Sequence, residues 1–204
     1  MKEFWNQVYN SSEYAYGKNP NSYFKSCIDK LPKGKLLLAA EGEGRNAVYA
    51  AETNWIVSAY DWSEVARDKA LQLTLEKEVQ FDYHLGSLKD LNFQTNCFDV
   101  LGLIYVHFPE SMRQINHTKL LNYVKPGGHI IIEAFHEDHL DYQKQNPNVG
   151  GPKMLQQLYT TQKIQSDFKD VKFQHLEEVE INLNEGYMHN GTTKVVRALA
   201  QKPF

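Results

Sequence analysis

Apolar residues recur along the chain in short runs, and segments with helical spacing separate most of these runs. The run KLLLAA ends at a glycine-containing loop, and the next segment repeats alanine and valine on one helical face. The pattern predicts strands over Lys35–Ala40, Trp55–Tyr60, Val79–Leu85, Phe98–Leu103 and His129–Phe135, and helices over Arg45–Thr53, from Ser63 as N-cap to about Lys77, and over Pro109–Val124. Such alternation indicates an α/β fold with a mostly parallel sheet and helices on both faces.

The last third of the chain has a different pattern. A polar loop is expected over Asp138–Pro152, then a helix over Met154–Phe168 and strands over Val171–Leu183 and Thr193–Gln201. Only a short turn around Gly186–Gly191 separates these two strands, so they should form an antiparallel hairpin at the edge of the sheet. Without repeats or linkers, residues 1–204 are expected to form one domain, with residues 1–24 as an aromatic N-terminal cap segment.

The composition of the chain limits the kinds of partner that it is expected to bind. The formal net charge is −3 and like charges do not cluster, so neither nucleic acid nor an anionic membrane is expected as a partner. No apolar stretch approaches the roughly 18–20 residues of a membrane span, and the N-terminus lacks a secretory apolar run. Cys27 and Cys97 have neither metal spacing nor a disulfide framework, which favours a cytoplasmic protein. The chain is expected to be a monomer or a homodimer.

The loop Ala40-Glu41-Gly42-Glu43-Gly44 lies between a predicted strand and a predicted helix, the context of a nucleotide-binding loop. Its glycines allow a ligand to approach the main chain, and the N–H groups of the next helix face that ligand. Asp61 ends the next strand, 19 residues after Gly42, where a carboxylate can accept hydrogen bonds from ribose hydroxyls.

The charges of the loop favour one nucleotide over another. Glu41 and Glu43 would oppose the pyrophosphate of a dinucleotide, and Ala47 replaces the third glycine of GxGxxG. S-adenosylmethionine carries a sulfonium and an ammonium instead of phosphate, so nearby carboxylates are favourable. Arg45 or the helix N-terminus could receive its carboxylate.

Several segments together resemble the class I S-adenosylmethionine-dependent methyltransferases, in particular the small bacterial tellurite-resistance and thiopurine-methylating types. They are AEGEGRNAVYAA, VSAYDWSEVARDKA, FDVLGLIYVHFP, LNYVKPGGHIIIEAF and the N-terminal WNQVYNSSEYAYGKNPN. The resemblance implies a Rossmann-like seven-stranded sheet of order 3-2-1-4-5-7-6 with the last strand antiparallel. It also implies that Trp62 packs on the adenine or ribose, that Ser87 and Leu88 border the adenine, and that Ile104–His107 line the sulfonium side.

The chain departs from the family pattern at two places. The family motif D-x-G-x-G-x-G corresponds here to Leu38-Ala39-Ala40-Glu41-Gly42-Glu43-Gly44, without the first acid and the first glycine. Ser87 stands where the family often has an aspartate near the adenine amine. The cofactor-binding residues predicted are Ala40, Glu41, Gly42, Gly44, Arg45, Asp61, Trp62, Ser87, Leu88 and Ile104.

Methyl transfer needs alignment of donor and acceptor, and it needs a base only where the nucleophile arrives protonated. His107 follows a strand at the ligand-binding edge and is the candidate base, although a purely structural histidine is equally compatible. Tyr16 is the second catalytic candidate, as an aromatic face for the sulfonium or as part of the cap. Glu133, inside an apolar strand, must lie near the site or face a buried partner. His136, His139 and His189 lack metal-ligand spacing, so no metal is predicted.

Three functions are compared with these observations. The first is an S-adenosylmethionine-dependent methyltransferase acting on a small molecule. The second is a non-catalytic module of methyltransferase fold that holds the cofactor or a metabolite, which the altered glycine loop keeps open. The third, a nicotinamide-dependent oxidoreductase, would need the complete GxGxxG that the sequence lacks.

Overall fold

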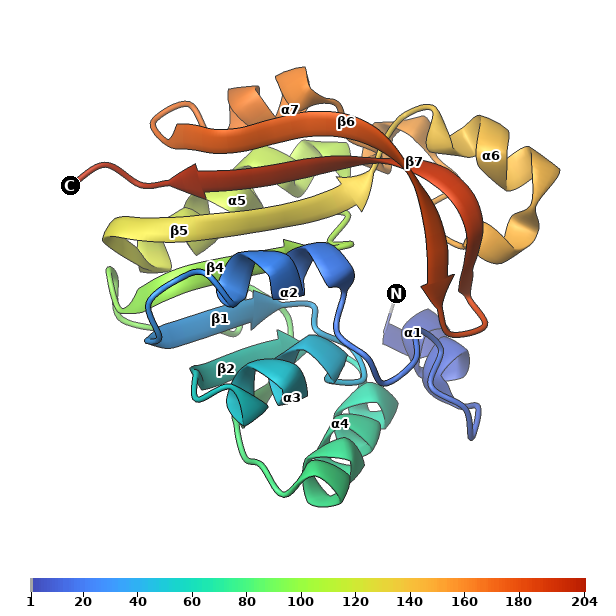
Figure 1. Cartoon of the computed structure of the whole chain (residues 1–204), viewed down its shortest axis with the longest axis horizontal. Helices are drawn as coiled ribbons and strands as arrows, with labels where there is room; N and C mark the ends of the chain where they lie inside the picture. Colours follow the sequence, from blue (N-terminus) through green and yellow to red (C-terminus); the bar gives the residue numbers. More distant parts are fainter. Residues whose placement is uncertain (1) are drawn as a thin grey trace.

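Seven strands form one sheet in the computed structural model, which describes residues 2–204 (Figure 1). They are β1 (Lys35–Ala39), β2 (Ile56–Asp61), β3 (Asp82–Leu85), β4 (Phe98–Ile104), β5 (Val124–Phe135), β6 (Lys172–Glu185) and β7 (His189–Gln201). Their spatial order is β3-β2-β1-β4-β5-β7-β6, which confirms the expected order. β1 pairs in parallel with β2 and β4, while β7 runs antiparallel to both β5 and β6.

Helices cover both faces of this sheet (Figure 1). They are α1 (Lys2–Tyr9), α2 (Ser22–Ile28), α3 (Arg45–Glu52), α4 (Glu64–Lys77), α5 (Glu110–Tyr123), α6 (His139–Gln145) and α7 (Thr161–Asp167), with short 3-10 turns at Pro147–Val149 and Leu155–Gln157. Leu36 and Leu38 of β1 pack with α2 and α3 on one face, whereas Leu37 packs with the residues of α5 and α7 on the other. Among residues 2–204 no helix has the length and apolar character to cross a bilayer.

Polar side chains cap the N-termini of two of the helices. The side chain of Ser63 accepts the N–H of Ala66 at 3.1 Å and caps α4, as the sequence predicts. Asn21 caps α2 in the same way, through the N–H of Phe24 at 2.9 Å. The two short helices α1 and α2 lie in and just beyond the segment that was expected to form an aromatic cap.

Three local predictions are wrong. The polar loop after β5 contains α6, because His139 at its start is buried against the ring of Phe135 at 4.0 Å. The single helix expected over Met154–Phe168 is interrupted, since Tyr159 is buried and forms a parallel bridge with His136. The strand expected over His129–Phe135 begins earlier, at Val124, so that Gly127 and Gly128 stand inside β5, where the ladder to β4 is irregular.

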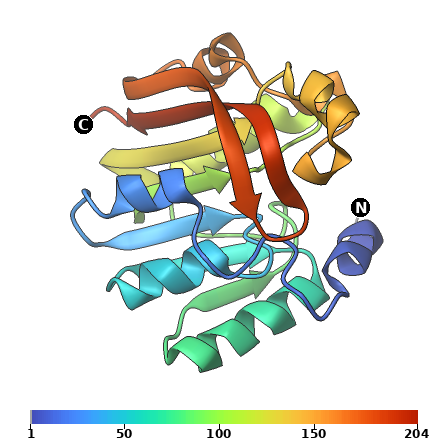
Figure 2. The same ribbon diagram turned by 45° about the vertical axis from the view of Figure 1, so that its right-hand side comes forward.

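The hairpin of β6 and β7 is longer than expected, and its tip reaches the segment that joins α1 to α2 (Figure 2). The N–H of Met188 in the turn donates to the carbonyl of Ala15 at 3.1 Å. Gly186 has a φ of 69°, and a Cβ there would lie 2.5 Å from both the Ala15 oxygen and the Gly17 nitrogen. Only glycine fits this contact, which joins the turn of the β6–β7 hairpin to the segment between α1 and α2.

Candidate active site

Two residues with a positive φ mark the carboxyl ends of the central strands. Ala40, directly after β1, has a φ of 48°, and Tyr105, directly after β4, has a φ of 55°. Such backbone strain collects at functional sites. The strand order reverses between β1 and β4, and ligands of open α/β sheets bind at this point. The geometry therefore places the candidate site at the ends of these two strands.

The glycines of the loop allow close approach from two sides. Gly44 begins α3 with a φ of 87°, and a Cβ there would lie 2.7 Å from the Cβ of Ala70 in α4. Gly42 has a φ of 63°, and its added Cβ would lie 2.7 Å from the hydroxyl of Tyr9. Gly44 thus permits helix packing, whereas Gly42 leaves room for a hydroxyl group beside the main chain.

The two glutamates of the loop bind groups of the protein itself. Glu41 accepts two N–H groups from the first turn of α3, each at 2.8 Å. Burial raises the pKa of Glu41 to about 7, because these hydrogen bonds offset its desolvation only in part. Glu43 accepts the N–H of Ala15 at 2.8 Å and is ion-paired with Lys69. Glu41 thus caps α3, and Glu43 fastens the N-terminal segment to the glycine loop.

Asp61 lies beside the loop, at the end of β2. Its carboxylate accepts the N–H of Gly42 at 3.2 Å and that of Ser63 at 2.9 Å, and its exposed fraction is 5%. Burial raises the pKa of Asp61 against these hydrogen bonds. Two main-chain donors leave acceptor capacity on both oxygens, so the carboxylate can also accept hydroxyl groups. The neighbouring Trp62 is half-buried.

The other predicted cofactor residues lie around this group. Ile104 is buried at the end of β4. Leu88 is buried in the turn after β3, and the hydroxyl of Ser87 donates to Asp90 at 2.7 Å. This turn meets Asp61 through the main chain, since the N–H of Gly86 donates to the Asp61 carbonyl at 2.9 Å.

Aromatic rings of the N-terminal segment lie over the loop. Tyr9 is buried, Trp5 stacks on it at 5.5 Å, and Tyr16 meets it edge-on at 6.4 Å. Lys69 of α4 holds the segment from below, because its ammonium donates to the carbonyls of Ser11 at 3.0 Å and Glu13 at 2.7 Å. Lys69 also pairs with Glu43, so the glycine loop and the N-terminal segment share one buried cation.

Arg45 ties the start of α3 to the end of β6. Its guanidinium donates to the Tyr16 carbonyl at 3.1 Å and to the Glu185 carboxylate at 3.0 Å, and the side chain is buried. Burial acts to raise the pKa of Glu185, but the hydrogen bond from His189 and the charge of Arg45 outweigh it and lower the pKa to about 2. The carboxylate is thus firmly ionised.

Asn21 connects the Arg45–Glu185 pair to a second ion pair, between Arg197 and Glu133. Its side-chain amide donates to Glu133 at 2.6 Å and to Glu185 at 3.1 Å. Glu133, fully buried, also accepts the hydroxyl of Tyr105 at 2.8 Å and the Nε of Arg197 at 2.6 Å. The carboxylate that the sequence placed inside an apolar strand therefore has a cationic partner, Arg197.

The predicted base, His107, is held by the main chain on both sides. Its Nδ1 lies 2.8 Å from the carbonyl of Gln157, and its Nε2 accepts the N–H of Phe135 at 3.4 Å. Burial lowers the pKa of His107 to about 4. Its two nitrogens are engaged in joining the end of β4 to its neighbours.

His189 is differently placed. Its Nδ1 lies 3.3 Å from the Glu185 carboxylate, and its ring contacts Tyr16 at 4.3 Å and Tyr105 at 4.6 Å. Burial lowers its pKa, although the hydrogen bond to Glu185 acts in the opposite direction. A carboxylate at Nδ1 fixes the tautomer and leaves Nε2 as the acceptor nitrogen.

Three residues of this network were not singled out from the sequence: Asn21, Glu185 and Arg197. One signal was available, because Arg197 interrupts the apolar run VVRALA just as Glu133 interrupts HIIIEAF. Two opposite charges inside two apolar strands point to a buried ion pair. The contacts of Asn21 and Glu185 span 164 residues and have no local pattern.

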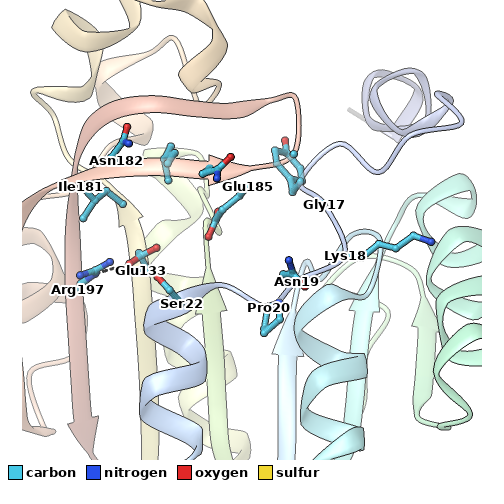
Figure 3. Close-up of a pocket in the computed structure, with 14 residues that line it drawn as sticks. Gly17, Lys18, Asn19, Pro20, Ser22, Glu133, Ile181, Asn182, Glu185 and Arg197 are labelled. Atoms are coloured by element: carbon cyan, nitrogen blue, oxygen red, sulfur yellow. Dashed lines mark hydrogen bonds and ion pairs between the residues drawn. The ribbon is translucent and has the colours of Figure 1, made fainter.

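A cavity of about 300 Å³ opens beside this network, between residues 16–22 and the end of the β6–β7 hairpin (Figure 3). Asn19, Pro20 and Ser22 border it from the N-terminal side. Glu133 and Arg197, which meet in an ion pair, border it from the sheet. Since Glu133 bonds Tyr105 and Glu185 bonds Arg45, the cavity adjoins the ends of β4 and of the glycine loop.

Comparison with known proteins agrees with this geometry. Residues 37–128 match the family model of a methyltransferase domain. No curated protein matches the sequence. Many solved structures share the fold, among them these three. One comes from work on the conversion of a disulfide bond into a thioacetal group during echinomycin biosynthesis (TM-score 0.80, 14% identity, 100% of this chain and 92% of that chain).

The second is a SAM-dependent methyltransferase from Methanosarcina mazei (TM-score 0.73, 13% identity, 88% of this chain and 97% of that chain). The third is TehB from Haemophilus influenzae (TM-score 0.70, 16% identity, 98% of this chain and 66% of that chain). The chain therefore has the fold of S-adenosylmethionine-dependent methyltransferases, and residues 37–128 match a methyltransferase domain.

Proposed function

We propose that this protein transfers a methyl group from S-adenosylmethionine to a small molecule. The observation that carries the proposal is the cavity of about 300 Å³ beside the ends of β4 and the glycine loop. Its size lies at the lower end of small-molecule sites, roughly 300–1,000 Å³. The N-terminal segment and the β6–β7 hairpin border it on two sides, which suits a compact acceptor.

The cofactor residues group around the ends of β1, β2 and β4. Asp61 has acceptor capacity for ribose hydroxyls, whereas the space beside Gly42 is taken by the hydroxyl of Tyr9. Ala40 and Ile104 border the reversal point, with Trp62, Ser87 and Leu88 toward the adenine. Glu41, Gly44 and Arg45 contribute indirectly. Their contacts are with other protein groups, and these contacts hold the loop in place.

These residues fit S-adenosylmethionine. The cofactor supplies an activated methyl group on a positively charged sulfur, and the rings of Tyr9, Tyr16 and Tyr105 lie around the strand ends, where their faces can stabilise a cation. Burial of Tyr9 excludes water from its part of this region.

We assign the role of general base to His189, in place of His107. The Glu185 carboxylate holds the Nδ1 proton of His189, and the ring is neutral at pH 7 because burial lowers its pKa. His189 itself is buried, but Tyr16 and Glu185, which contact it, border the cavity. No hydrogen bond to Nε2 is found among residues 2–204, so this nitrogen can take a proton from a thiol, hydroxyl or ammonium acceptor that reaches it from that side. Tyr16, in ring contact with His189, positions it.

Calorimetry with S-adenosylhomocysteine, the demethylated cofactor, tests the assignment of Asp61. Asp61→Asn should weaken binding by about 1–3 kcal/mol, because charged hydrogen bonds to the ribose are lost. Asp82→Asn, on the exposed start of β3, is the matched control and should leave the affinity unchanged. Equal affinities of the wild type and Asp61→Asn would show that the ribose binds elsewhere.

A turnover assay separates the enzyme from a non-catalytic binding module. Release of S-adenosylhomocysteine is measured with a panel of small thiol, hydroxyl and amine acceptors. Turnover of at least one acceptor supports the proposal. Cofactor binding without turnover of any of them would favour the binding module.

A further inference from the structure

Arg197 borders the cavity and has hydrogen-bond donors that no described residue uses. Its Nε donates to Glu133, and its guanidinium carbon lies 5.1 Å from the centre of the Tyr23 ring. Within residues 2–204 neither terminal nitrogen has a hydrogen-bond partner, and the side chain is 19% exposed. The fork is therefore fixed in orientation and reachable from the cavity (Figure 3).

The carboxylates of the cavity have no such spare capacity. Glu133 accepts hydrogen bonds from Asn21, Tyr105 and Arg197, and Glu185 accepts from Asn21, Arg45 and His189. Each carboxylate is already satisfied by three donors inside the protein. A ligand in the cavity thus meets unused donors and few unused acceptors, which favours a ligand with anionic oxygens.

The charge of the site selects among anions. Arg197 is balanced by Glu133, and Arg45 is balanced by Glu185, with Glu177 opposite Arg197 on the neighbouring strand. Two guanidinium groups against three carboxylates leave a net charge of −1, which opposes a dianion such as a phosphate more strongly than a singly charged anion. A carboxylate carries one charge, and its two oxygens match the planar fork of an arginine.

We propose that Arg197 anchors a carboxylate of the methyl acceptor, so that the substrate class is a small carboxylic acid. The inference rests on the proposed function, because it takes the cavity to be the acceptor site. Glu133 acts as a positioning residue, since it holds Nε and turns both terminal nitrogens toward the ligand.

Ligand-observed NMR tests the anchor, with benzoate and benzamide as probes and saturating S-adenosylhomocysteine present. The two probes have the same shape and differ in charge. Benzoate should bind the wild type at least ten times more tightly than benzamide. Arg197→Lys keeps the charge without the fork and should weaken benzoate binding at least fivefold. Lys18→Gln, at the rim of the same cavity, should change it less than twofold.

Removal of Arg197 alone would leave Glu133 buried without its cation and could unfold the protein. The double variant Glu133→Gln/Arg197→Gln replaces the ion pair by a neutral one, and it should lose the preference for benzoate while it still binds S-adenosylhomocysteine. Equal affinity for the two probes, or an equal loss in Lys18→Gln and Arg197→Lys, overturns the inference. Failure of the wild type to bind S-adenosylhomocysteine would instead overturn the proposed function.

Discussion

Ala40 stands where the family pattern has the first glycine of the loop, and its φ of 48° is still that of a glycine position. The backbone of the motif is thus kept although the residue type is not. Tyr105 shows the same property at the end of β4, where its φ of 55° lets its hydroxyl reach Glu133. The left-handed backbone of both residues costs free energy, and the surrounding structure holds the two strand ends in this conformation.

Ala40→Gly should therefore stabilise the protein. Glycine removes the steric cost of the left-handed backbone, and Ala40 is exposed, so no packing is lost. The net gain is expected to be about 0.5–1 kcal/mol, after the larger entropy loss of glycine. Urea unfolding measures it. Ala39→Gly, at the buried end of β1, is the control and should destabilise; a loss in both variants would contradict the strain at Ala40.

His189→Gln should lower turnover about 100-fold or more, because a positioned general base contributes at least this factor. The affinity for S-adenosylhomocysteine should stay within twofold, and turnover should recover in part at high pH, where the acceptor ionises in solution. The measurement is kcat between pH 6 and 9 for a thiol acceptor. His107→Gln is the matched control; a greater loss of turnover in this variant would return the role of base to His107.

Among the secondary-structure elements, the sequence predicts the central strands well because their apolar runs face helices on both sides. The same rule fails for α6 and for the interrupted helix before α7. There, His139 and Tyr159 are placed by contacts with Phe135 and His136, which come from elsewhere in the chain. The glycine loop and Asp61 were predictable for the same local reason as the strands, whereas the partners of Glu133 and Arg45 depend on tertiary contacts.

Lys69 fastens the segment that follows helix α1, because its ammonium donates to the carbonyls of Ser11 and Glu13 and pairs with Glu43 of the glycine loop. Lys69→Gln should raise amide hydrogen exchange in residues 2–16 at least tenfold, because it removes the cation shared by the segment and Glu43. Exchange in β6 and β7 should not change. Lys77→Gln, which loses only an ion pair with Glu52 on the surface, is the control. Unchanged exchange in residues 2–16 would show that other contacts, such as the aromatic packing and the hydrogen bond between Ser63 and Asn6, hold the helix.

At the scale of the whole molecule, buried ionisable groups give stability a pH dependence. Burial lowers the pKa of both His107 and His139 to about 4, so between pH 6.5 and 4 the unfolded chain binds more protons than the native one. Their contribution to stability is present above pH 6.5 and is lost as the pH falls. Glu41 acts in the opposite direction, because its raised pKa of about 7 favours the native state at low pH.

Urea unfolding at pH 7.5 and 5 separates these contributions. His107→Gln should reduce the loss of stability on acidification by about 2 kcal/mol relative to the wild type. Glu41→Gln should increase the same loss, since it removes the opposing group. Parallel pH profiles for the two variants would contradict this assignment.

The side-chain amide of Asn21 bridges two carboxylates that lie 112 and 164 residues further along the chain. During synthesis the chain folds from its N-terminus onward, yet this amide has neither partner until β5 and then β6 have been made. Arg197, which neutralises Glu133, comes later still, within the last eight residues. A nascent chain can thus complete most of its sheet before it has a cavity, and a chain that stops short of β7 lacks the cation that Glu133 requires.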